Sequence, residues 1–74
     1  MKLKTVNVVE VTNGVVNALS SYSEDNAGNR SAEKDFRLLV LARGGNPDHM
    51  RVYIEDGRWV DQREDYQVLL VHSE

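Results

Sequence analysis

The chain has 74 residues, a formal net charge of −3 and no cysteine. This length predicts one domain, residues 1–74, with a single small core, and the lack of cysteine excludes disulfides and thiolate metal sites. No apolar run approaches the roughly 20 residues of a membrane span, and the N-terminal stretch has no signal-peptide pattern, so we expect a cytoplasmic protein without a membrane partner. The basic residues do not cluster, so we do not expect nucleic-acid binding.

The first element is a β-hairpin. Residues 2–12 are rich in β-branched side chains, which favour a strand. Asn13-Gly14 follows, and this dipeptide accepts the positive φ values that a two-residue hairpin turn needs. The predicted register places Thr12 opposite Val15, Val11 opposite Val16, Val9 opposite Ala18 and Val8 opposite Leu19.

This register divides the hairpin into two faces, and only one of them can pack on a helix. One face is predicted to carry Leu3, Val9, Val11, Val16, Ala18 and Tyr22. The other is predicted to carry Val6, Val8, Val15 and Leu19, and we take this second face as a candidate for self-association or partner binding.

A long amphipathic helix is predicted over residues 29–43. Ala32, Phe36, Leu39, Val40 and Arg43 follow the spacing of one helix face, and Leu38 and Leu41 are expected to widen it. Asp25, Asn29 and Ser31 are all suitable N-cap residues, and the sequence does not choose among them, so a start as early as Asn26 stays open. Gly44-Gly45 predicts the end of the helix.

The second half has two possible structures between residues 47 and 60. Asn46 as N-cap, Pro47 at the first position and Gly57 at the end predict a short helix, 47–56, which we favour. The alternative is a hairpin closed by Asp56-Gly57, with Glu55 opposite Arg58 and Ile54 opposite Trp59. In either case 58–61 forms a strand, and the apolar strand 66–72 is expected at the centre of the sheet. The fold class is therefore α+β in the order ββααββ, with an antiparallel sheet of three or four strands and two helices packed on one face.

The sequence contains no motif for catalysis, a cofactor or phosphate binding, so we expect a non-enzymatic protein that binds another protein or itself. Trp59 beside Arg58 is the best candidate for a surface anchor, because Trp, Tyr and Arg dominate interface energies. The alternative is that Trp59 covers the second helix at the rim of the core. The predicted contact residues are Arg58, Trp59, Asp61, Tyr66, Val6, Val8 and Leu19.

Two alternative functions are an acidic inhibitor and an enzyme. Asp56, Asp61, Glu64 and Asp65 would form one acidic surface if the protein were an inhibitor that imitates nucleic acid. An enzyme would need a polar pocket, which a chain this small forms most easily across a dimer interface. We expect no metal, because His72 with Asp61, Glu64 or Asp65 has no metal-ligand spacing.

The sequence also resembles a group of small proteins of bacteria and their mobile elements that have no assigned activity. The resemblance spans roughly residues 4–73, and it implies that Asp56-Gly57 closes a short helix and that the protein is of bacterial or phage origin. It is carried by Gly28-Asn29, Ala32-Glu33, Phe36, Glu55-Asp56-Gly57, Asp65-Tyr66, Val68 and Leu70-Val71-His72-Ser73.

Overall fold

The computed structural model describes residues 4–73, and it confirms the α+β class and the ββααββ order. The elements are β1 (Thr5–Thr12), β2 (Val15–Ser23), α1 (Asn26–Ala42), a 3-10 turn η1 (Pro47–His49), α2 (Met50–Asp56), β3 (Arg58–Asp61) and β4 (Tyr66–Ser73).

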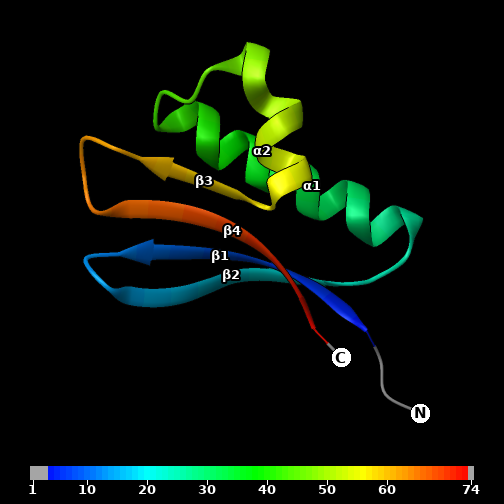
Figure 1. Cartoon of the computed structure of the whole chain (residues 1–74). Helices are drawn as coiled ribbons and strands as arrows, with labels where there is room; N and C mark the ends of the chain where they lie inside the picture. The colour runs from blue at the N-terminus through cyan, green and yellow to red at the C-terminus, as the bar shows by residue number, and fades with distance from the viewer. Residues whose placement is uncertain (1–3, 74) are drawn as a thin grey trace.

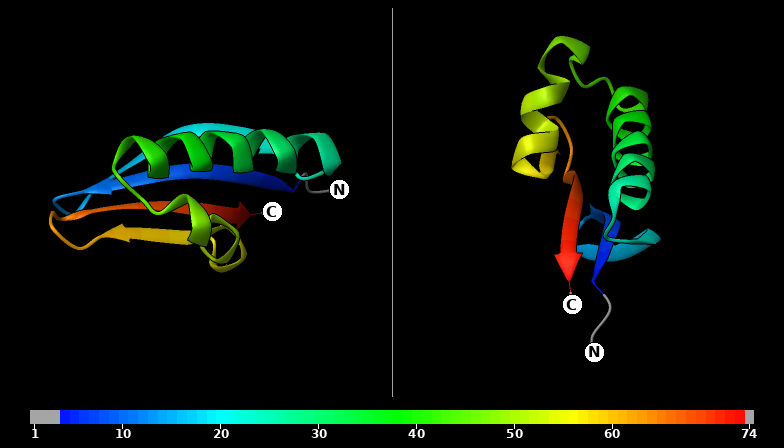
Figure 2. Two further views of the ribbon diagram at one scale, coloured as in Figure 1. Left: turned by 90° about the horizontal axis from the view of Figure 1, so that it is seen from above. Right: turned by 90° about the vertical axis from the view of Figure 1, so that its right-hand side faces the viewer.

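The four strands form one antiparallel sheet in the order β2-β1-β4-β3. The central position predicted for residues 66–72 is confirmed, because β4 lies between β1 and β3. Both helices lie on the same side of the sheet, with α1 packed against β2, β1 and β4 and α2 beside β3 (Figures 1 and 2). The other side of the sheet is covered by no element of the described chain.

Local turn chemistry explains where most elements begin and end. Asn13 has φ 52° and Gly14 has φ 80°, which confirms the predicted two-residue hairpin turn. The Asn46 side chain accepts a hydrogen bond from the Asp48 N–H at 2.9 Å, and Gly57 ends α2 with φ 67°. The predicted helix 47–56 is therefore confirmed as η1 followed by α2, and the alternative hairpin is wrong.

The long helix uses the earliest start that the sequence allowed, three residues before the favoured start at residue 29, because the first of its three possible caps is used. The Asp25 carboxylate accepts a hydrogen bond from the Gly28 N–H at 2.7 Å, so α1 starts at Asn26. The helix ends at Ala42, followed by Gly44 with φ 91°. The expectation that Leu38 and Leu41 widen the buried face is wrong, since they are 57% and 41% exposed.

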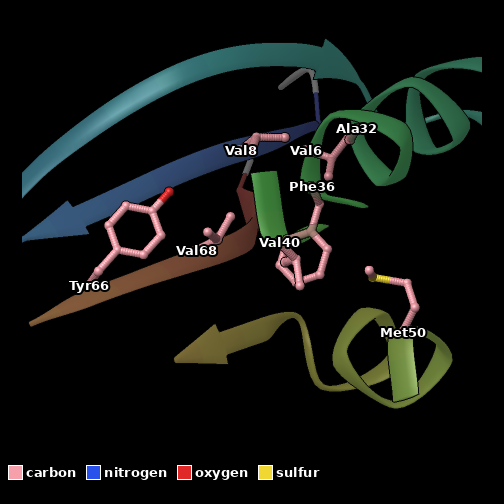
Figure 3. Packing of buried hydrophobic residues seen from close by; sticks show 8 residues of the cluster. All are labelled: Val6, Val8, Ala32, Phe36, Val40, Met50, Tyr66 and Val68. Atoms are coloured by element: carbon pink, nitrogen blue, oxygen red, sulfur yellow. The ribbon is translucent and has the colours of Figure 1, made fainter. Parts of the chain in front are cut away.

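The core lies between the helices and the sheet (Figure 3). Phe36 and Val40 of α1 point down onto Val8 of β1 and Val68 of β4, and all four are fully buried. Spacings of four residues place Gly28, Ala32, Phe36 and Val40 on one side of α1. The core cluster consists of Val6, Val8, Ala32, Phe36, Val40, Met50, Tyr66 and Val68.

The predicted assignment of the hairpin faces is wrong in two respects. Val6 and Val8 face the helices, and Val9 and Val11 occupy the opposite face. The register also shifts between Val8 and Val9, so Val8 pairs with Ser20 and Leu19 is the extra residue of a β-bulge. Because a one-residue shift moves every later side chain to the other face, Tyr22 lies on the helix side. Leu3 lies outside the described residues.

Candidate protein-binding face

The side of the sheet away from the helices carries a cluster of apolar side chains, and we call this side the open face. Strand alternation and the pairing register define it. Val9 lies at its centre and is only 8% exposed, because Ala18 and Leu69 flank it on the neighbouring strands. The apolar residues of the open face are Val9, Val11, Val16, Ala18, Val60, Leu69 and Val71.

The rest of the open face is polar but almost without charge. Arg58, at the β3 edge, is the one charged residue that the described strands place there. Thr5, Asn7 and Ser73 satisfy one another: the Thr5 and Ser73 hydroxyls are 2.8 Å apart, and the Asn7 amide donates to the Ser73 hydroxyl at 3.1 Å. Glu10 and Asp61, the carboxylates of the described strands, both point to the helix side. In a chain with net charge −3, this face therefore offers an approaching protein little electrostatic resistance.

Four of the seven predicted contact residues are buried on the helix side. Val6, Val8 and Tyr66 are 2% exposed or less, and Asp61 is 6% exposed. These four cannot touch a partner, because the helices and the loop after Gly44 cover them. The sequence missed the reversal because both faces of β1 are apolar, so residue type alone does not decide which face meets the helix.

Trp59 is half-buried and lies on the helix side, where it belongs to a series of ring contacts. Its ring centroid is 6.5 Å from that of Tyr53 and 6.5 Å from that of Tyr66, and Tyr53 in turn meets His49 at 6.3 Å. The Arg43 guanidinium ends the series, 3.8 Å from the Tyr66 ring centroid. These contacts attach α2, β3 and β4 to one another, as the alternative reading of Trp59 predicted.

Tyr66 and Asp61 have local partners that explain their burial. The Tyr66 hydroxyl donates to the Glu10 carboxylate. Burial, and then this hydrogen bond, raises the pKa of Tyr66 to about 12. The Asp61 carboxylate accepts from the Arg63 backbone N–H at 3.0 Å and contacts the Arg63 guanidinium at 3.4 Å. Asp61 thus fixes the turn before β4 and adds no charge to an acidic surface.

The remaining two predicted contact residues are exposed, but at the margins of the sheet. Arg58 lies on the open face at the β3 edge. Leu19 is 48% exposed and lies beside Leu38 and Leu39 of α1, above the β2 edge. On this margin the hydroxyls of Ser20 and Tyr22 both donate to the Asp35 carboxylate. The hydrogen bond between Tyr22 and Asp35 is the main cause that raises the pKa of Tyr22.

The histidine considered as a metal ligand has another partner. His72 Nδ1 lies 2.9 Å from the Glu24 carboxylate at the end of the sheet, away from Asp61. Within residues 4–73, no group of three or more potential ligand side chains is arranged to hold a metal ion. No helix in that range is both long enough and apolar enough to cross a bilayer.

Comparison of the chain with protein-family models, with curated proteins and with solved structures found no match. A functional proposal for this chain therefore rests on its own residues and their geometry.

Proposed function

We propose that this chain is a small protein-binding domain that acts through its open face rather than by catalysis. The observation that carries the proposal is the uncovered, almost uncharged side of a sheet whose other side packs against both helices. Contiguous apolar patches of this kind mark interaction sites on small domains. Burial of Asp61 removes one of the four carboxylates on which the acidic-mimic function depends, which favours the open face.

The position of the apolar residues supports a docking role for the open face. At the centre Val9 is 8% exposed and Leu69 is half-buried, whereas Val16 and Val60 are 65% and 40% exposed at opposite margins. The polar group of Thr5, Asn7 and Ser73 already has internal hydrogen bonds, so covering it does not leave these groups without partners. A partner would therefore gain apolar contact at the centre without a large desolvation penalty at the rim.

Two substitutions in neighbouring positions of β2 test this function. Val16→Asp places a charge on the open face, whereas Val15→Asp places one on the opposite side, and the two side chains are similarly exposed at 65% and 59%. We expect immobilised wild-type protein and Val15→Asp to retain the same identified protein from a cell extract. Val16→Asp should lose it, with circular dichroism unchanged. Equal retention by both variants would contradict the proposal.

A further inference from the structure

We infer that the occupant of the open face is a second copy of this chain, packed sheet against sheet in a two-fold symmetric dimer. This inference rests on the proposed function and names the partner of the same face. The first argument is charge, since a surface with Arg58 as its one charged residue has no means of selecting a nucleic acid or a strongly charged protein. Two copies of this face meet without opposing carboxylates, although the chain as a whole is acidic.

The second argument is the order of side chains across the sheet. One row reads Val16, Val11, Gln67, Val60 from β2 to β3, and the next reads Ala18, Val9, Leu69, Arg58. A two-fold axis parallel to the strands turns the second sheet over, so that β1 of one copy lies across β4 of the other. The end of the sheet that carries these two rows then lies against the same end of the second sheet.

This arrangement matches small side chains with large ones. Val9 of one copy meets Leu69 of the other, and Ala18 meets the long Arg58 side chain. Val16 meets Val60, so the most exposed valine of the sheet is covered at the margin. Every such contact occurs twice, because a two-fold interface uses the same patch on both copies.

The third argument is size. Three strands of eight or nine residues and one of four, about 4.8 Å apart and rising about 3.3 Å per residue, give a face of roughly 450 Å² in projection. Specific interfaces bury about 800 Å² of accessible surface per partner, and upright side chains expose more area than their flat projection. A second copy of equal width covers the whole face, and this small interface is of the size expected for a weak, concentration-dependent dimer.

A cysteine pair tests the packing directly, because the natural chain has no cysteine. Val16 and Val60 lie on the two outer strands, about 14 Å apart within one copy, whereas facing Cα atoms of two packed sheets lie about 10 Å apart, which is too far for a disulfide but within reach of a short thiol-to-thiol cross-linker. In the dimer, Val16 of one copy faces Val60 of the other. We expect Val16→Cys/Val60→Cys treated with a short bismaleimide to give a covalent dimer of twice the 8.4 kDa chain mass.

The matched control is Val15→Cys/Val60→Cys, which should stay monomeric because Val15 points to the helix side. Sedimentation of the unmodified chain should show a monomer–dimer equilibrium, and Val16→Asp should weaken it by about tenfold or more, with Val15→Asp near wild type. A wild-type chain that remains monomeric at about millimolar concentration overturns the dimer, whatever the variants do. If the chain is monomeric but Val16→Asp still loses an identified protein, the dimer fails and the proposed function stands.

Discussion

Tyr66 shows how one residue serves both the core and the polar network beneath α1. Its ring is buried between Trp59 and the Arg43 guanidinium, and its hydroxyl reaches Glu10 on the neighbouring strand. A phenol in this position resists ionisation, because the anion would be desolvated and would face a carboxylate. The apolar pattern of residues 66–72 predicts a central strand. It does not predict that Tyr66 bonds to Glu10, which is 56 residues away in the chain.

The raised pKa of Tyr66 predicts a loss of stability in alkaline solution. The ordinary tyrosine pKa is 10.0 and the folded value is about 12, so the folded state binds the proton more tightly than the unfolded state. The contribution is complete below pH 10 and disappears as pH rises through 12. Urea titrations should show a steeper fall of the unfolding free energy for wild type than for Tyr66→Phe above about pH 10.

Below about pH 9, the two proteins should differ by a constant amount, on the order of 1 kcal/mol for the lost hydrogen bond. Parallel curves across the alkaline range would contradict the role of the Tyr66 hydroxyl.

At the level of elements, the first turn of α1 shows how tightly the helix is joined to β2. Gly28 is buried, and a Cβ atom at this position would lie 1.7 Å from the Ser23 carbonyl oxygen. The absence of a side chain therefore lets the end of β2 pass directly against the helix. The helix predicted over residues 29–43 leaves Gly28 outside it, and the contact with Ser23 is visible only in three dimensions.

Gly28→Ala should consequently destabilise the protein, although alanine is about 1 kcal/mol more favourable than glycine in an ordinary helix. We expect a loss of about 1–3 kcal/mol, because backbone atoms must move to accommodate the methyl group. Arg30→Ala, at an exposed position two residues on, should change the stability by less than about 0.5 kcal/mol. Thermal unfolding of both variants measures the contrast, and a stabilised Gly28→Ala protein would contradict the contact.

The sequence predicts the elements better than it predicts their faces. Asn13-Gly14, Asn46-Pro47 and Gly57 act within a few residues, so the hairpin, the second helix and its end follow from local chemistry. The bulge at Leu19 has no such signal, and it decides where Tyr22 points. The sequence predicts an uncovered sheet face, but it assigns Val6 and Val8 to that face because β1 is apolar on both sides.

At the level of the whole molecule, the sheet depends on a pair of strands from opposite ends of the chain. β1 and β4 are the two central strands, and Thr5 lies opposite Ser73. Most of the buried residues contributed by the sheet belong to these two strands. Local contacts within the β1–β2 hairpin therefore cannot form the core alone, because a two-stranded hairpin is at best marginally stable in water.

Removal of residues 66–73 should accordingly abolish cooperative unfolding, because these residues form a central strand and not an edge strand. The truncation deletes Tyr66 and Val68 from the core and leaves β3 without its pairing strand. We expect the near-ultraviolet circular dichroism signal of packed aromatic side chains to be lost, and we expect no cooperative thermal transition. A truncated chain that still melts cooperatively would show that α1 and the first hairpin suffice.

The pairing of Thr5 with Ser73 has a consequence for the order of events during synthesis. The first hairpin leaves the ribosome with one long edge of β1 unoccupied, and its proper neighbour, β4, is the last of the four strands of this sheet. Closing a contact across 68 residues is slow compared with local helix formation. Until translation reaches that strand, the nascent hairpin presents an apolar edge that other chains can pair with, and a chaperone that shields it at this stage would improve the yield of correctly folded protein.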